Sequence, residues 1–498
     1  MLTRLKVDGF KNLVDVDVRF GPFTCIAGAN GVGKSNLFDA VRFLSLAANP
    51  NYSLLEAAQR VRDESGRNTD VRGIFHRTGD RTAETISFEV EMIVPREAID
   101  ALGQTGRATT TFLRYRLVIR LRPAATNGTN ANPLEIVEEE LKHIKKGSAH
   151  EHLLFPLNVH EWRDRVVIGR RAGIAFISTT QKDDGTSIIK LHQDAQDAKG
   201  GGRAFERAAE TLPRTVLSSS TAAESPTALC ARREMQSWRL LQLEPTALRQ
   251  PDEFTAPAHI ESNGRHLAAN LNRLALKDDP ARVYGQLANR LSELIGSVRT
   301  IRIDRDEKRE LLTLMMTGDD GTELPARALS DGTLRFLALS VLELDPETPG
   351  VICLEEPENG IHPDRIPAML RLLGDIATDP NEPADETNPL RQVIVNTHSP
   401  SVVMAVPEES VLLARPVNAL REGRRFSKVE FACLPGDWRN KGTVRCQEIA
   451  IGEMLSYLNP QAIIVRERVI VKEKPSPRRS RLVIDHPEFK LFVPPESQ

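Results

Sequence analysis

Hydrophobic and polar side chains alternate over residues 14–20, with valines on one face and charged side chains, Arg19 among them, on the other. A period of two predicts a half-exposed strand. A short apolar run at 23–27 is typical of a buried strand, and the apolar residues over 37–46 have the spacing of a helix. The chain is therefore expected to begin with strands that lead into a helix.

The middle of the chain changes from strand patterns to helical patterns. Residues 179–203 are polar and rich in glycine, which predicts a surface loop or a partly disordered segment. Helical patterns dominate from about 231 to 295, without the sustained heptads of a long coiled coil. Alternating residues before these two regions predict strands at 85–94, 110–121 and 135–141.

The last third of the chain alternates between the two kinds of element. Two predicted strands, at 298–304 and 311–317, come first. They are followed by a helix at 333–344, a strand at 350–354, a helix from Pro363 and a strand at 392–396. Strands that alternate with helices indicate a parallel sheet.

Composition excludes some classes of protein without identifying a site. The 498 residues are 40% hydrophobic and 27% charged, with a formal net charge of −2, which is typical of a soluble globular protein. Aromatic residues make up only 5%, which argues against a large stacking surface for single-stranded nucleic acid. The five cysteines show no paired spacing, and no apolar run approaches membrane-spanning length. We expect a cytoplasmic protein without a membrane partner.

The buried strand at 23–27 ends in the glycine-rich stretch GANGVGKSN. Residues 28–35 match G-x-x-x-x-G-K-[ST] and stand between a predicted strand and a predicted helix, as a phosphate-binding loop requires. Lys34 is expected to reach the β- and γ-phosphates, and the Ser35 hydroxyl to bind Mg²⁺. The expected ligands are therefore ATP and Mg²⁺. The candidate nucleotide-binding residues of this loop are Asn30, Gly31, Gly33, Lys34, Ser35 and Asn36.

Two carboxylates end the predicted strand at 350–354, in the stretch VICLEEPENGIHP. Ligands of parallel sheets bind at the C-terminal ends of the strands. Glu355 is expected to hold Mg²⁺ through water, and Glu356 to polarise the attacking water as a general base. Alone, the stretch could equally be a strand that ends in a solvated acidic turn. A phosphate-binding loop in the same chain favours the catalytic interpretation.

A histidine and a serine turn complete the candidate residues. His398 follows the next predicted strand, in VIVNTHSP, where an imidazole could contact the γ-phosphate, so we predict a catalytic role; a single histidine is more often structural. Residues 330–333, Ser-Asp-Gly-Thr, precede a predicted helix. On the residues alone, this turn is most simply a helix N-cap, although exposed N–H groups at a helix start also attract anions.

The order of the phosphate-binding loop, LSDGT, LEEPENGIHP and NTHSP resembles the ABC-type ATPase superfamily. More narrowly, it resembles the short predicted AAA-type ATPases of the overcoming-lysogenization-defect, RecF and SMC-like group, as in prokaryotic anti-phage defence systems. The resemblance covers residues 1–48 and 300–415, and the centre only loosely, mainly at SNGRHLAANLNRL. It implies an α/β P-loop NTPase of ABC-ATPase type. Its mixed sheet would be flanked by helices, with a β-rich N-terminal lobe and an inserted helical region.

The resemblance also implies a division of the chain. Residues 1–48 and 300–415 would form the ATPase head, and residues 49–299 a β-rich lobe with an inserted, mainly helical region. Residues 416–498 would supply C-terminal strands and a tail.

By the same resemblance, Ser330 and Gly332 belong to the signature turn. In such ATPases this turn caps the γ-phosphate that is bound to the P-loop of the opposite subunit. A homodimer or higher homo-oligomer through ATP-bound heads is therefore expected. The chain departs from the common pattern at Asp331, where most signatures have glycine, and at Glu355, where an aspartate is commoner. The Q-loop of these ATPases cannot be placed from the sequence.

The biological role rests on the resemblance alone. The leading hypothesis is an ATPase that regulates or scaffolds a separately encoded, nuclease-like effector in anti-phage defence. The alternatives are a RecF-like repair ATPase that binds DNA, and an ATP-gated protein scaffold or sensor without DNA binding. Four arginines that alternate along one predicted strand are candidate DNA contacts, although such a stripe is more often solvated. They are Arg114, Arg116, Arg120 and Arg122.

Overall fold

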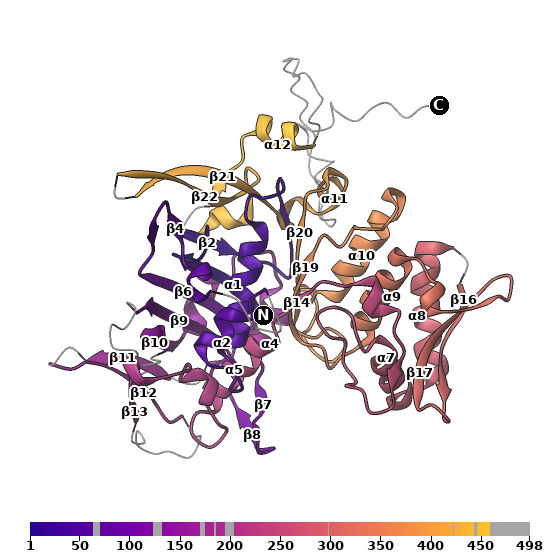
Figure 1. Cartoon of the computed structure of the whole chain (residues 1–498), viewed down its shortest axis with the longest axis horizontal. Helices are drawn as coiled ribbons and strands as arrows, with labels where there is room; N and C mark the ends of the chain where they lie inside the picture. The colour runs from indigo at the N-terminus through magenta and orange to yellow at the C-terminus, as the bar shows by residue number, and fades with distance from the viewer. Residues whose placement is uncertain are drawn as a thin grey trace.

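Two lobes flank a central sheet, as Figure 1 shows. The left lobe in this view contains the N-terminal strands, and the right lobe contains the helices α7 to α10. The architecture is α/β, with a mixed sheet flanked by helices. The computed structural model describes residues 1–62, 70–122, 132–169, 175–183, 186–194, 204–296, 298–421, 423–442 and 446–458.

The central sheet carries the motifs at one edge. Its seven strands follow the order β14-β19-β20-β3-β21-β22-β23, and the first five are parallel. Both faces of β19 and β20 are buried, as expected for apolar strands of a parallel sheet. The bounds are β14 Arg239–Leu241, β19 Gly350–Glu355, β20 Arg391–Thr397, β3 Phe23–Ala27, β21 Val411–Arg421, β22 Arg424–Cys433 and β23 Gln447–Glu448. Because β3, β19 and β20 are parallel neighbours, the segments that follow them meet at one edge.

The N-terminal lobe is an eight-stranded antiparallel sheet in the order β13-β12-β11-β10-β9-β6-β1-β2. The three strands predicted between 85 and 141 are confirmed as β6, β9 and β10. The bounds are β1 Leu2–Asp8, β2 Val16–Arg19, β6 Thr85–Ile93, β9 Phe112–Leu121, β10 Leu134–His143, β11 Ile177–Gln181, β12 Ser187–Leu191 and β13 Phe205–Ala208. Helix α1 (Lys34–Ala47) packs on this sheet, and its Phe43 ring lies 5.3 Å from that of Phe88.

The second lobe joins helices to a four-stranded sheet with the path β15-β17-β16, in which β18 pairs with the middle strand, β17. The helices are α6 Pro245–Leu248, α7 Leu267–Lys277, α8 Pro280–Ile295, α9 Asp331–Leu344 and α10 Ile366–Ile376. The strands are β15 Asp252–Glu253, β16 Val298–Asp306, β17 Leu311–Gly318 and β18 Glu323–Pro325. No helix among the described residues is long and apolar enough to span a membrane.

The remaining elements are short. Two small hairpins pair β4 (Arg77–Thr78) with β5 (Arg81–Thr82) and β7 (Glu97–Ile99) with β8 (Thr105–Arg107). The other helices are α2 Leu54–Gln59, α3 Ala149–His152, α4 Asp164–Val166, α5 Pro226–Gln236, α11 Pro400–Ala405 and α12 Ile451–Leu458. The predicted C-terminal tail beyond 458 lies outside the described residues, and the division of the chain into domains stays a prediction.

Three expectations about elements were wrong or incomplete. The stretch 179–203, predicted as a surface loop, contains the end of β11 and all of β12, whose isoleucines and leucine are buried; residues 184–185 and 195–203 lie outside the described residues. The predicted helical region also contains β14, which is too short for its period to be recognised. Arg19, predicted to be exposed, is only 8% exposed because its guanidinium donates to the carbonyl of His152, at 2.8 Å.

Two of the four arginines in the predicted stripe face carboxylates on the neighbouring strand. Arg116 Nε lies 3.0 Å from a carboxylate oxygen of Glu138, and Arg122 Nε lies 3.4 Å from one of Glu135, both on β10. Ion pairs of this kind neutralise the positive charge with which an arginine would bind the phosphate backbone of DNA. At Arg116 and Arg122 the contacts therefore favour a structural role, and whether the stripe touches DNA stays a prediction.

A buried carboxyl on β10 predicts how stability depends on pH. Burial raises the pKa of Glu139 from 4.5 to about 7, against the opposing effect of hydrogen bonds from the N–H groups of Leu217 and Val216. The folded state then retains the proton over this range while the unfolded state loses it. Stability is therefore expected to fall as pH rises from about 4.5 to about 7, by about 3 kcal/mol from this group alone.

The test compares urea unfolding of the native chain and Glu139→Gln at pH 5 and pH 8. The amide oxygen can still accept a backbone hydrogen bond but never ionises. At each pH, the free energy of unfolding of the native chain is subtracted from that of the variant. We expect this difference to be about 2 to 3 kcal/mol more favourable to the variant at pH 8 than at pH 5. A difference that does not change with pH would show that Glu139 is ionised at both.

Candidate nucleotide-binding site

The glycine-rich loop joins β3 to the first turn of α1. Gly33 is the N-cap of this helix, with φ of 109°, and Lys34 is its first residue. The Lys34 ammonium donates to the carbonyl oxygens of Gly28 and Ala29, at 2.7 and 2.9 Å. Burial lowers the pKa of Lys34, although nearby carboxylates, Glu356 foremost, act against this. A buried lysine held only by loop carbonyls is a cation in position to receive an anion at the helix start.

Asn12 was not among the residues predicted for the site. Its side chain holds this loop through two hydrogen bonds. Its amide Nδ2 donates to the carbonyl of Val32 at 2.8 Å, and its Oδ1 accepts from the side chain of Asn36 at 2.7 Å. A Cβ built on Gly33 would lie 2.1 Å from Asn12 Nδ2. Glycine is therefore required at this position by both backbone conformation and space.

Glu356 lies at the end of β19 in a rare backbone conformation, with φ of 47°. Its N–H donates to the backbone carbonyl of Asn396 at 3.0 Å and to the side-chain oxygen of the same residue at 3.1 Å. Its carboxylate accepts from Asn359 Nδ2 at 2.8 Å and lies 2.7 Å from His398 Nδ1. Although partial burial opposes it, these hydrogen bonds hold the pKa of Glu356 below its ordinary value, so the group is ionised at neutral pH.

Glu355 faces the loop from the same strand end. Its Oε2 accepts a hydrogen bond from Gln242 Nε2, at 2.9 Å. Its Oε1 is buried and accepts no hydrogen bond within the part of the chain that the structure describes, and Arg62 Nη1 lies 3.9 Å from it. Asn396 Nδ2 lies 3.4 Å from the hydroxyl oxygen of Ser35 and so connects the strand ends to the loop. A carboxylate oxygen that accepts no hydrogen bond and a serine hydroxyl are oxygen ligands of the kind that Mg²⁺ prefers.

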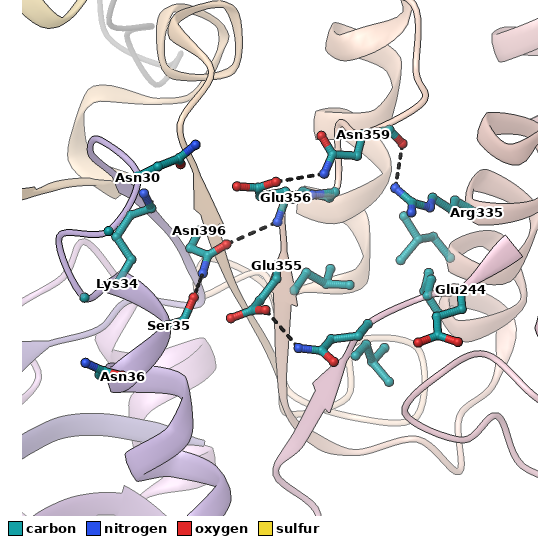
Figure 2. A pocket seen from close by; sticks show the side chains of 18 residues that line it. Asn30, Lys34, Ser35, Asn36, Glu244, Arg335, Glu355, Glu356, Asn359 and Asn396 are labelled. Carbon is teal, nitrogen blue, oxygen red and sulfur yellow. Dashed lines mark hydrogen bonds between the residues drawn. The ribbon is translucent and has the colours of Figure 1, made fainter. Parts of the chain in front are cut away.

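These groups line one cavity of about 590 Å³, a size common for small-molecule sites. Figure 2 shows Lys34 and Ser35 on one wall, Glu355 and Glu356 at the centre, and Arg335 on the opposite wall. All six residues predicted in the loop line the cavity, as do both carboxylates. His398 meets the site through its contact with Glu356.

Ser330 and Gly332 are not among the residues that line this cavity. The Ser330 hydroxyl accepts from the N–H of Thr333 at 3.2 Å, so it caps helix α9. A Cβ on Gly332 would lie 2.5 Å from the carbonyl oxygen of Gly360, in the loop that follows the carboxylates. Within one chain, the serine turn therefore packs beside the loop that follows Glu356 and does not face the phosphate-binding loop.

Sequence reasoning missed the amides that connect the site. Gln242 follows β14, in a region whose pattern appeared helical, and Asn396 precedes His398 within a predicted strand. A signal for Asn396 was available, because a polar residue at the end of a buried parallel strand indicates a ligand-binding edge. For Gln242 the sequence offers no such signal, since its strand has only three residues.

Comparisons with known proteins identify a family and several similar structures. A family model described as "AAA domain, putative AbiEii toxin, Type IV TA system" matches residues 23–99 and 135–405. No curated protein matches the chain. The chain is similar to solved structures of SMC heads. The first is an SmcHead bound to the C-winged helix domain of ScpA, with 14% identity, a TM-score of 0.43, and coverage of 87% of this chain and 98% of that one.

Two further structures show similar values. For the SMC head domain from Thermotoga maritima the identity is 11% and the TM-score 0.35, with 87% of this chain and 99% of that chain covered. For the Smc head domain with an extended coiled coil, bound to the C-terminal domain of ScpA and derived from Pyrococcus furiosus, the identity is 11% and the TM-score 0.39. In that comparison 87% of this chain and 96% of that chain are covered.

Proposed function

This chain belongs to the family described as "AAA domain, putative AbiEii toxin, Type IV TA system", whose model matches more than half of it, and we propose that it binds ATP with Mg²⁺. We propose further that it hydrolyses the bond between the β- and γ-phosphates. The observation that carries the proposal is the meeting of two motifs in one cavity. The phosphate-binding loop and the paired carboxylates are distant in sequence, yet both line the same 590 Å³ space.

Each polar group has a role that its contacts support. Lys34 and the loop N–H groups hold the β- and γ-phosphates, and Ser35 with Glu355 holds Mg²⁺, which neutralises phosphate charge when bound. Glu356, kept ionised by its hydrogen bonds, accepts a proton from the attacking water. His398 orients that carboxylate through its Nδ1 contact. We infer that Gln242 serves as the glutamine of the Q-loop, because it contacts Glu355, the carboxylate proposed to bind Mg²⁺, from a neighbouring strand end.

The active assembly that we propose is a head-to-tail pair of heads. Ser330 and Gly332 lie outside the cavity of their own chain, so their predicted role at a γ-phosphate needs a second copy of the chain. The turn has a suitable chemistry for that role, since a long helix begins there with a hydroxyl and free N–H groups.

We propose further that ATP-driven pairing of the heads regulates a separately encoded effector, of nuclease type, in prokaryotic anti-phage defence. The family description names a toxin within a TA system, which supports a protein partner. The paired arginines of β9 give no support to DNA binding on that face. A RecF-like DNA-binding ATPase remains the alternative, and stimulation of ATP turnover by duplex DNA would favour it.

A mixture of two inactive variants tests the shared site. Lys34→Ala removes the loop cation, and Ser330→Arg blocks the serine turn. Each variant alone is expected to be nearly inactive. Co-expressed with different tags, they form mixed pairs with one intact site each. Turnover should then recover to about half of the native value in tandem-purified mixed pairs, and to about a quarter in the unsorted mixture, if the sites act independently.

The control is co-expression of each variant with itself under both tags. A tandem-purified mixed pair that hydrolyses no ATP, although it carries both tags, would contradict a site shared between chains. Binding of ATP by the Ser330→Arg variant separates the two halves of the proposal. If that variant binds ATP normally, the phosphate-binding loop is functional whatever the outcome of the mixing.

A further inference from the structure

An ion pair stands at the serine turn, where the chain has an aspartate in place of the usual glycine. Asp331 is the first residue of α9, and its Oδ1 lies 2.5 Å from Nη2 of Arg249. The same guanidinium nitrogen donates to the carbonyl of Leu329 at 3.0 Å, on the other side of the turn. Arg249 therefore holds the residues before and after Ser330. The side chains of Arg249 and Asp331 are 26% and 55% exposed, so the pair lies at the surface.

A carboxylate at this position suits the helix but not a phosphate. Negative charge at the first turn of a helix is stabilising, because the N-terminal end of the helix is electropositive. A triphosphate that approached the same turn would be repelled by that carboxylate. Arg249 supplies the opposite charge at hydrogen-bond distance, and it is the only cation that forms an ion pair with Asp331 among the described residues.

Arg249 also links this turn to the site of its own chain. It caps the C-terminal end of α6, a helix that begins shortly after Gln242, and Gln242 contacts Glu355. Leu248, the last residue of α6, is only 2% exposed and anchors the helix in the hydrophobic core. Truncation of the Arg249 side chain therefore leaves the position of α6 supported by packing.

We propose that Arg249 is a positioning residue for ATP hydrolysis: it neutralises Asp331 and fixes the backbone at Leu329, so that the turn 330–333 accepts the γ-phosphate held by a second copy of the chain. This inference rests on the proposed head-to-tail pair. It explains why an aspartate is tolerated in this turn, since the charge is cancelled by a residue from another element.

A charge-rescue series tests the proposal. Arg249→Ala leaves Asp331 uncompensated, and we expect ATP turnover to fall by about tenfold or more. The double variant Arg249→Ala/Asp331→Asn should recover most of the lost activity, because the repulsive charge is gone. Lys277→Ala is the matched control, since it removes a cation from an exposed ion pair with Glu347 in the same lobe.

A second readout does not depend on turnover. In a Glu356→Gln background, ATP-dependent pairing of the chains is measured by sedimentation. Arg249→Ala should weaken this pairing, and the defect should shrink as salt is raised, because salt screens the exposed carboxylate. A purely structural loss would not respond to salt in this way. The pairing should likewise return when Asp331→Asn is added.

Two outcomes would overturn the inference. If the double variant is as impaired as Arg249→Ala, the guanidinium does not act by neutralising Asp331. If Arg249→Ala changes neither turnover nor pairing, the ion pair has no part in the reaction. The shared site itself is tested separately by the mixture of Lys34→Ala and Ser330→Arg, in which Arg249 and Asp331 are native. If that mixture stays inactive, the head-to-tail pair fails, whatever the result of the Arg249 series.

Discussion

Replacement of Glu356 by glutamine is expected to reduce ATP turnover by between about a hundredfold and about ten-thousandfold, while ATP binding is retained. The carboxylate accepts hydrogen bonds from Asn359 and His398 and is ionised at neutral pH, as a general base must be. Glutamine keeps the size of the side chain but cannot take a proton from water. Phosphate release measures the first effect, and binding of a fluorescent ATP analogue measures the second.

The matched control is Glu347→Gln, which removes a carboxylate that is 55% exposed and paired with Arg273 and Lys277 in the other lobe. We expect no more than a small change in turnover for this variant. Turnover of Glu356→Gln close to the native rate would assign the base to another group. Glu358 would then be the next candidate, because it is buried two residues further on and accepts a hydrogen bond from Thr397.

The parts of the site that could be predicted are those with local signals. The phosphate-binding loop has a fixed spacing of glycines, lysine and serine, and its strand and helix have recognisable periods. The carboxylates stand at the end of an apolar strand. Because parallel strands place their ends at one edge, the meeting of Lys34 with Glu355 and Glu356 followed from the order of elements alone.

The remaining parts depend on contacts between distant positions. Gln242 and Glu355 are separated by 113 positions, and Arg249 and Asp331 by 82. No periodicity relates the members of such pairs, and an exposed arginine or glutamine has many ordinary explanations. Asp331 is instructive in this respect. The sequence identified it as a departure from the signature pattern, but only the fold shows which cation faces it.

The serine turn shows how one structure can satisfy two interpretations. Ser330 caps α9, as the residues alone indicated, and the same helix start is the predicted phosphate-capping turn. A cap leaves other N–H groups of the first turn free, so the two roles are compatible. The contact of Gly332 with Gly360 ties the turn to the loop that follows Glu356. In the proposed pair of heads, a change in the loop that follows Glu356 would therefore move the surface that faces the second copy.

Replacement of Gly33 by alanine is expected to weaken ATP binding by about a hundredfold or more. The backbone at this position has φ of 109°, which strains any residue with a Cβ. The added Cβ would lie 2.1 Å from Nδ2 and 2.6 Å from Oδ1 of Asn12. Asn12 would have to move, and its hydrogen bonds to Val32 and Asn36 would be lost. Titration calorimetry with ATP and Mg²⁺ measures the effect.

Two companion variants separate collision from backbone strain in this prediction. Gly31→Ala places a Cβ where no atom lies within 4 Å, although φ is 78° there, so it should weaken binding less than Gly33→Ala. Adding Asn12→Ala to Gly33→Ala removes the obstructing amide, so part of the lost affinity should return. If Gly33→Ala binds ATP as well as the native chain does, the loop must bind phosphate in a conformation other than this one. If only the double variant regains affinity, Asn12 fixes the loop through the contact described here.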